Sequence, residues 1–145
     1  MYNKNFDLIF TFQLSPITVG ITSGFFAFIK NCPSIMWVLD LWPDTLSAYG
    51  FLKTKWQLNI IKIFVNWIYS RCDVILAQSK SFLKEINSYP SVKNNSIYFP
   101  SWGEINLFQK KHPLAKEIIK KDIFTILFAG NIGEAQDFPN ILRAI

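Results

Sequence analysis

Histidine and cysteine are scarce in this chain of 145 residues, which contains one histidine and two cysteines. The single His112 excludes histidine-rich metal motifs, and its place before Pro113 indicates a surface loop. Cys32 and Cys72 are far apart and show no paired spacing, so we predict neither a metal site nor a disulfide framework. This cysteine usage is typical of the reducing cytosol, and we expect a cytoplasmic protein.

The motifs of several common reaction types are also missing. There is no Gly-Lys-Ser/Thr, no Asp-x-Asp and no Gly-x-Ser-x-Gly, which argues against a Walker phosphate loop, one kind of metal–diphosphate site and a hydrolase nucleophile elbow. The longest apolar run, residues 17–29, is interrupted by small and polar residues. It is shorter than the roughly 18 to 20 residues that span a bilayer, so it predicts a buried helix.

The chain is apolar and weakly charged, with 50% hydrophobic and 17% charged residues, which predicts a folded protein. Five Trp, five Tyr and fourteen Phe exceed what a small core needs, so we expect some aromatic surface to meet another molecule. The net charge is +5, and residues 109–121 hold five lysines. A solvated basic linker is favoured there over attraction to anionic lipids or phosphorylated substrates, and we expect no nucleic-acid partner.

Short apolar segments alternate with longer amphipathic ones along the chain. We predict strands at residues 6–12, 35–39, 74–77, 97–99 and 123–129, and helices at 16–29, 52–70, 79–86 and 138–145. Ser15 before Pro16, and Ser79 or Ser81, are the expected N-caps. The alternation predicts an α/β, Rossmann-like parallel sheet with helices on both faces.

The predicted helix 52–70 has one narrow polar stripe. Lys55, Asn59, Lys62 and Asn66 recur at helical spacing, and apolar residues fill the other sides. Such a helix is either buried on most sides or pressed against a membrane interface, and we favour burial against the sheet.

Polar motifs follow the predicted strands, and the carboxyl ends of parallel strands meet at one edge, where ligands bind. The motifs are Gln13-Leu-Ser15-Pro16, Asp40-Leu-Trp-Pro-Asp44, Gln78-Ser79, Pro100-Ser-Trp-Gly-Glu104 and Gly130-Asn-Ile-Gly-Glu-Ala-Gln136. In the second motif, a carboxylate could bind a hydroxyl while Trp42 packs on a sugar face or an acyl chain. Equally, Asp40 could cap the turn made by Pro43 while Trp42 fills the core.

The last motif is a glycine loop between a strand-like run and a helix start. Gly130 and Gly133 would let the backbone approach a ligand, and a helix start favours negative charge. The spacing is not that of the dinucleotide fingerprint, so the loop indicates an anionic ligand without naming it.

Three segments together resemble a bacterial branch of the family 4 glycosyltransferases. They are Trp37-Val-Leu-Asp-Leu-Trp-Pro-Asp44, Tyr98-Phe-Pro-Ser-Trp-Gly-Glu104 and Phe128-Ala-Gly-Asn-Ile-Gly-Glu-Ala-Gln-Asp137. The resemblance implies the GT-B architecture of two Rossmann-like domains around a cleft. It also implies retaining, metal-independent transfer from a nucleotide-sugar to a saccharide or lipid-linked acceptor, in capsule or O-antigen synthesis. Peripheral contact with the cytoplasmic face of the inner membrane would follow.

On this resemblance, residues 1–108 form part of the acceptor-side domain, residues 109–121 the linker, and residues 122–145 the start of the donor domain. Asp40 would be the catalytic contributor, and Ser15, Trp42, Asp44 and Glu104 would line the cleft. The residues implied to face the donor are Gly130, Asn131, Gly133, Glu134 and Gln136.

The chain departs from that family at three positions. Leu39 stands where many relatives have a histidine, and Asn131 and Gln136 stand where many have Arg and Lys. We therefore expect polar orientation of the donor rather than charge neutralisation. The family's late pair of glutamates is also missing, so we expect a fragment that is inactive alone. The alternatives are a non-catalytic binding or membrane-interfacial module, or one subunit whose complementary chain carries the rest of the donor domain.

Overall fold

The computed structural model describes residues 5–103, 123–133 and 136–145. The chain divides into two compact units, Met1–Ser101 and Trp102–Ile145. Glu104 and the predicted linker at residues 109–121 lie outside the described residues.

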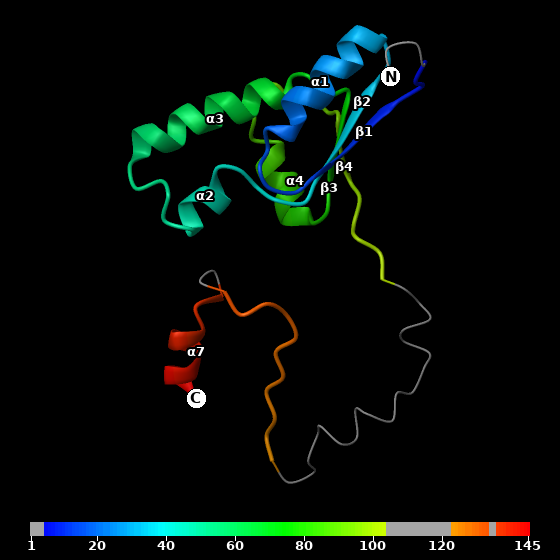
Figure 1. Ribbon diagram of the computed structural model, residues 1–145. Helices are drawn as coiled ribbons and strands as arrows, with labels where there is room; N and C mark the ends of the chain where they lie inside the picture. Colours follow the sequence, from blue (N-terminus) through cyan, green and yellow to red (C-terminus); the bar gives the residue numbers. More distant parts are fainter. Residues whose placement is uncertain (1–4, 104–122, 134–135) are drawn as a thin grey trace. The chain divides into compact units, whose positions relative to one another are not determined.

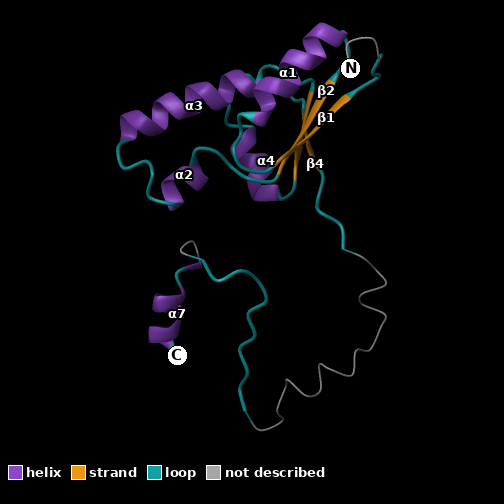
Figure 2. Cartoon of the chain, viewed as in Figure 1, coloured by secondary structure: helices purple, strands orange, loops and turns teal. Residues whose placement is uncertain are grey.

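The first unit is built on a parallel sheet of four strands in the order β1-β2-β3-β4 (Figures 1 and 2). The strands are β1 (Ile9–Gln13), β2 (Ser34–Val38), β3 (Val74–Ala77) and β4 (Ser96–Tyr98). The helices between them are α1 (Val19–Lys30), α2 (Asp44–Ala48), α3 (Lys55–Tyr69) and α4 (Lys80–Ile86). The predicted α/β, Rossmann-like fold is confirmed.

Local signals explain most helix ends. Ser79 caps α4, because its hydroxyl accepts the Phe82 N–H at 3.1 Å. The Gln57 side chain accepts the Thr54 N–H at 3.2 Å at the start of α3. Asn31, with a φ of 50°, ends α1 in the left-handed conformation that asparagine tolerates. The predicted N-cap at Ser15 is wrong: α1 begins three residues beyond Pro16.

The core lies on one face of the sheet. Met36 and Val38 of β2, with Ile75 and Ala77 of β3, are fully buried against apolar side chains of the helices and their connections. Those partners are Ile17, Val65, Ile68, Tyr69 and Ile86. Because each right-handed crossover steps to the next strand in the same direction, α1, α3 and α4 lie on the same face. We expected helices on both faces of the sheet, whereas the described helices cover only one face.

The opposite face of the sheet, called here the open face, is aromatic. Trp37 stands between Phe12 and Phe99 with edge-to-face ring contacts, and both centroid distances are 5.3 Å. The Trp37 indole N–H also donates to the Phe99 carbonyl at 3.2 Å. Phe10 and Phe12 at the β1 end of this face are about half exposed. Part of the excess of aromatic residues therefore lies on a surface that no described helix covers.

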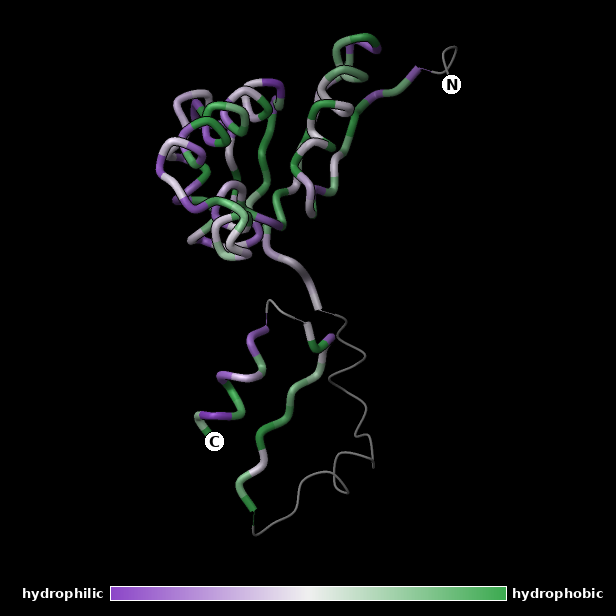
Figure 3. Tube along the Cα trace, turned by 60° about the vertical axis from the view of Figure 1, so that its left-hand side comes forward, coloured by the Kyte–Doolittle hydropathy of each residue, from purple (hydrophilic) through white to green (hydrophobic). Residues whose placement is uncertain are grey.

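The second unit contains helix α7 (Phe138–Ala144), close to its predicted place. The predicted strand at residues 123–129 is wrong: the segment is drawn as a loop in Figure 2, and Figure 3 colours most of it as hydrophobic. A strand is defined by main-chain pairing, and the described residues supply this segment with no neighbouring strand. Its side chains remain exposed, Phe124 at 91%.

Among the described residues, no helix combines the length and the apolar character needed to cross a membrane.

Candidate site at the carboxyl edge of the sheet

Four of the five predicted polar motifs follow the carboxyl ends of neighbouring strands. Gln13 ends β1, and its carbonyl accepts the Leu39 N–H just beyond β2 at 2.9 Å. Gln78 follows β3, and its side-chain amide donates to the Leu39 carbonyl at 2.9 Å. The motif after β4 begins at Pro100, but from Trp102 onward it belongs to the second unit, as the glycine-loop motif does. The shared edge is therefore confirmed for the first three motifs.

Four side chains form a hydrogen-bonded group at this edge, called here the Ser15–Asp40 cluster: Ser15, Asp40, Trp42 and Thr45. The Trp42 indole N–H donates to the Ser15 hydroxyl at 3.1 Å. Ser15 donates to one carboxylate oxygen of Asp40, and Thr45 reaches the other. The Thr45 hydroxyl also lies 2.7 Å from the Leu41 carbonyl, so its single proton is shared between two acceptors. Hydroxyl groups thus hold both oxygens of Asp40.

The loop after β2 is held by a hydrogen bond from a residue that follows α4. Its Trp42–Pro43 bond is cis, as is Ser15–Pro16 in the opposing loop. The Tyr89 hydroxyl donates to the Trp42 carbonyl at 3.0 Å. Burial raises the pKa of Tyr89, and the negative charges of Glu85 and Asp44 raise it further. Tyr89 therefore stays a neutral hydrogen-bond donor at physiological pH.

The structure does not decide between the two interpretations offered for the Asp40–Asp44 motif. Asp40 accepts a hydrogen bond from the Thr45 side chain within the turn, but among the described residues no backbone N–H donates to its carboxylate as capping would require. Trp42 packs partly against the core, yet its N–H faces Ser15. Both residues are half-buried, so part of the Asp40 carboxylate and part of the indole remain accessible. Asp44 is exposed in the first turn of α2, and no described hydrogen bond joins it to the cluster.

The glycine loop has a different arrangement. The Gln136 side-chain oxygen accepts the Gly133 N–H at 3.0 Å, so an amide expected to meet a phosphate is already paired. Gly130 lies against the Phe128 ring, where an added Cβ would come within 3.1 Å. Asn131 is exposed, and Glu134 lies outside the described residues. Helix α7 begins at Phe138, where it was predicted, which is five residues after Gly133.

Two residues of the site, Thr45 and Tyr89, were not predicted from the sequence. Thr45 lies four residues after Leu41, the spacing at which a threonine hydroxyl reaches back to a carbonyl, so a local signal existed. Tyr89 lies 47 residues from Trp42 and has no local signal for this contact. Only the packing of α4 beside β3 brings it there.

In the part of the chain that the structure describes, no three His, Cys, Asp or Glu side chains are grouped as a metal site would need. A scan against protein-family models and a search of curated proteins both find no match to this chain. The resemblance to family 4 glycosyltransferases, with its donor, acceptor and metal-independent reaction, therefore stays a prediction.

Proposed function

We propose that this chain takes part in retaining sugar transfer from a nucleotide-sugar to a saccharide or lipid-linked acceptor in surface polysaccharide synthesis. The observation that carries the proposal is the Ser15–Asp40 cluster at the carboxyl edge of a parallel sheet, which is where such folds bind ligands. The motif resemblance at residues 37–44 points to the same place in the chain.

The cluster has the chemistry to bind a sugar hydroxyl. An ionised carboxylate has about four acceptor positions, and Ser15 and Thr45 occupy two of them. The remaining positions can accept hydrogen bonds from a saccharide, and the half-buried Trp42 ring offers an apolar face to a sugar ring. In this proposal Asp40 orients the acceptor beside the reacting centre, and Ser15 and Thr45 orient Asp40.

Support for donor binding is weaker. The Gly133 N–H is paired with Gln136, and none of the described residues from 130 to 136 carries a positive charge. A diphosphate would have to displace Gln136 and would find no opposite charge in this part of the loop. We therefore assign the first unit to the acceptor and expect the chain to need further groups to hold a donor.

Saturation-transfer NMR with methyl glycosides of glucose, galactose, mannose and N-acetylglucosamine tests the acceptor assignment. We expect at least one glycoside to bind at millimolar concentration and the Asp40→Asn variant to lose that signal. Asp44→Asn is the matched control, because it makes the same chemical change at an exposed position outside the cluster. Equal signals from wild type and Asp40→Asn, or no signal with any glycoside, would contradict the assignment.

Calorimetric titration with UDP-glucose and GDP-mannose tests the donor side separately. We expect no measurable heat, because the Gly133 amide is already paired and the described part of the glycine loop carries no positive charge. Clear binding by the chain alone would overturn the division of roles proposed above.

Contact with a membrane surface is a second candidate function, favoured by an observation on α3. Trp56, Ile60, Ile63 and Trp67 lie at i, i+4, i+7 and i+11 and are 43–70% exposed. The other side of α3, around Val65 and Ile68, is buried in the core. Helix α3 is thus apolar on two sides, of which one packs in the core of the first unit and the other is exposed.

The neighbouring charges fit an anionic bilayer surface. The exposed Lys55 and Lys62 of the predicted polar stripe run beside the exposed apolar stripe. Arg71, just beyond the helix, stacks over the Trp67 ring with its guanidinium 5.4 Å from the centroid. Tryptophan and basic residues around an apolar stripe are typical of interfacial helices.

Co-sedimentation with vesicles tests the membrane contact. We expect binding to vesicles containing 30% phosphatidylglycerol and weaker binding to pure phosphatidylcholine. Ile60→Ser together with Ile63→Ser should weaken binding at least tenfold, since each removes about 1.5–3 kcal/mol of apolar burial. Phe28→Ser on α1, 83% exposed, is the control. Equal loss with Phe28→Ser would contradict a role specific to α3.

A further inference from the structure

The hydrogen bonds of the Ser15–Asp40 cluster run in one direction, toward Asp40. The Trp42 indole nitrogen can only donate, so the Ser15 oxygen, 3.1 Å away, accepts its proton. A serine hydroxyl has one proton of its own, and Ser15 donates it to one carboxylate oxygen of Asp40. The first group therefore fixes the direction of the chain, and Asp40 is its final acceptor.

The two oxygens of the Asp40 carboxylate are engaged in the same way. Oδ2 accepts from Ser15, and Oδ1 contacts the Thr45 hydroxyl. Each carboxylate oxygen has two acceptor positions, so one position remains on each oxygen. Among the described residues, no further donor reaches either oxygen. Asp40 is half-buried and Ser15 is exposed, so a ligand can approach the carboxylate from solvent.

The two remaining positions of Asp40 accept protons and offer none. A carbonyl or ether oxygen of a ligand can only accept, so it gains no hydrogen bond from them. A ligand must instead bring two donors that lie side by side, one for each carboxylate oxygen. Neighbouring hydroxyl groups on a sugar ring are such a pair.

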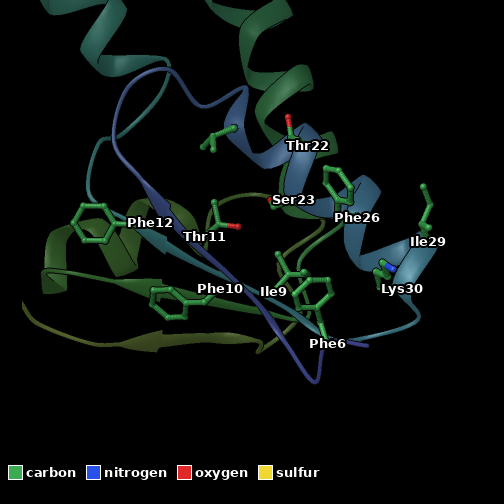
Figure 4. A pocket seen from close by; sticks show the side chains of 11 residues that line it. Phe6, Ile9, Phe10, Thr11, Phe12, Thr22, Ser23, Phe26, Ile29 and Lys30 are labelled. Carbon is green, nitrogen blue, oxygen red and sulfur yellow. The ribbon is translucent and has the colours of Figure 1, made fainter. Parts of the chain in front are cut away.

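The groove between β1 and α1, of about 490 Å³, offers no comparable group. Figure 4 shows that aromatic and aliphatic side chains such as Phe6, Phe26 and Ile29 line much of it. No carboxylate is among the described residues that line this groove, and no member of the Ser15–Asp40 cluster is. Hydroxyl donors therefore find a charged acceptor at the cluster and none in the groove.

We infer that the Ser15–Asp40 cluster selects saccharides with two free neighbouring ring hydroxyls, an inference that rests on the acceptor assignment proposed above. One hydroxyl donates to each oxygen of Asp40, while Ser15 and Thr45 hold the carboxylate in place. A saccharide that lacks either proton, or is substituted at either hydroxyl, loses one of the two hydrogen bonds and binds more weakly.

Deoxy analogues of methyl glycosides test this selection with the complete chain. In glucosides, galactosides and mannosides, hydroxyl 3 belongs to both neighbouring ring pairs, so the 3-deoxy compound has no such pair. The 6-deoxy compound loses one hydroxyl but keeps both pairs, which makes it the matched control. In saturation-transfer NMR titrations we expect the 6-deoxy compound to bind within about threefold of its parent. The 3-deoxy compound should bind about tenfold more weakly, because hydrogen bonding to a charged group is lost.

The 3-fluoro analogues separate proton donation from size. Fluorine occupies a space similar to that of a hydroxyl group, yet it has no proton to donate. We expect the 3-fluoro compound to bind as weakly as the 3-deoxy compound. Binding equal to that of the parent glycoside would show that hydroxyl 3 is recognised by its size, and would overturn the inference.

The ¹³C resonance of the Asp40 carboxyl carbon locates the selection in the chain. The 6-deoxy glycoside should shift this resonance, the 3-deoxy glycoside at equal concentration should shift it little, and the Ile29 methyl resonances in the groove should not move. Equal binding and equal Asp40 shifts with both compounds would overturn the selection and leave the acceptor assignment standing. If no glycoside binds, or none shifts Asp40, the acceptor assignment fails as well. Displacement of the 6-deoxy glycoside by ethylammonium at equal concentration would assign the two positions to a cation and overturn the inference.

Discussion

The indole nitrogen of Trp42 and the hydroxyl of Ser15 lie 3.1 Å apart, although 27 residues separate them in sequence. This hydrogen bond joins the loop after β1 to the loop after β2. The Ser15 hydroxyl in turn donates a hydrogen bond to Asp40, so the orientation of the carboxylate depends on both loops. From the sequence, Ser15 was predicted to cap a helix, but its hydroxyl instead bonds Trp42 and Asp40. Substitution of Ser15 therefore tests this contact directly.

Replacing Ser15 with alanine should release the Trp42 indole. The indole N–H resonance of Trp42 should move upfield in a ¹⁵N–¹H spectrum, and the free energy of unfolding should fall by about 0.5–1.5 kcal/mol per lost hydrogen bond. Ser15→Thr keeps a hydroxyl and should restore both values. An unchanged indole resonance in Ser15→Ala would show that the hydrogen bond does not form in solution.

Replacing Tyr89 with phenylalanine should loosen the turn at Trp42. The variant removes the hydroxyl that donates to the Trp42 carbonyl at 3.0 Å, and the carbonyl loses its buried donor. We expect the free energy of unfolding, measured in urea, to be about 1–2 kcal/mol lower than in wild type. Tyr49→Phe is the matched control, because Tyr49 is 56% exposed, and its effect should stay below about 0.5 kcal/mol. Equal effects of the two variants would be the contrary result.

Alkaline pH should destabilise the first unit through Cys72. Burial, followed by the charge of Asp73, raises the pKa of this thiol from 9.0 to about 12. Between these values the folded thiol keeps its proton and the unfolded one loses it. The unfolded state then binds fewer protons than the folded state. The contribution of Cys72 to the free energy of unfolding is therefore fully present below pH 9. It falls as the pH rises toward 12, by at most about 1.4 kcal/mol per pH unit.

Urea unfolding at pH 7, 9 and 10.5 measures this loss. Burial also raises the pKa values of Tyr69 and Tyr89, so part of the decline should remain in Cys72→Ala. The variant should nevertheless lose less stability than wild type between pH 9 and 10.5. Identical slopes for the two proteins would mean that Cys72 titrates normally in the folded chain.

Alanine should be tolerated poorly at Gly20 and better at Gly24, although both lie in α1. An added Cβ at Gly20 would come within 2.5 Å of Ile68 Cγ2 and of Met36 Cε. At Gly24 the nearest atom is Arg71 Cβ at 3.1 Å. Overpacking costs about 1–3 kcal/mol, whereas both variants gain about 1 kcal/mol of helix propensity.

Thermal unfolding of the two glycine variants isolates the packing term, because the propensity gain cancels in the comparison. We expect Gly20→Ala to melt lower than Gly24→Ala by several degrees. The reverse order would show that α1 does not pack against α3 and β2 at Gly20.

The prediction of regular structure succeeded where local patterns and tertiary packing agree. The predicted strand at 74–77 matches β3, because its run of aliphatic residues is buried between two neighbouring strands that pair with it. Ser79 was recognised as a cap because its hydroxyl contacts its own helix. Residues 123–129 have the same apolar pattern but no strand partner among the described residues, so the pattern alone did not make a strand.

The candidate site was only partly predictable. Asp40, Trp42 and Ser15 were named from motifs, and their place at the carboxyl edge followed from the parallel alternation of strands. The hydrogen bonds among them were not predicted, because Ser15 had been assigned to a helix end. No local sequence pattern predicts the contact of Tyr89 with Trp42 or the place of β1 at the edge of the described sheet.

The amino-acid sequence by itself determined the fold class, the order of the four paired strands with α1, α3 and α4, and the polar residues that follow those strands; helix α2 was not predicted. These follow from hydrophobic periodicity and from caps, which act within a few residues of each other. Only the tertiary structure decided that the described helices cover one face, that Trp42 meets Ser15, and that no other described strand pairs with the outer edge of β1. Such features depend on which distant segments become neighbours in space, and no local interaction energy specifies that choice.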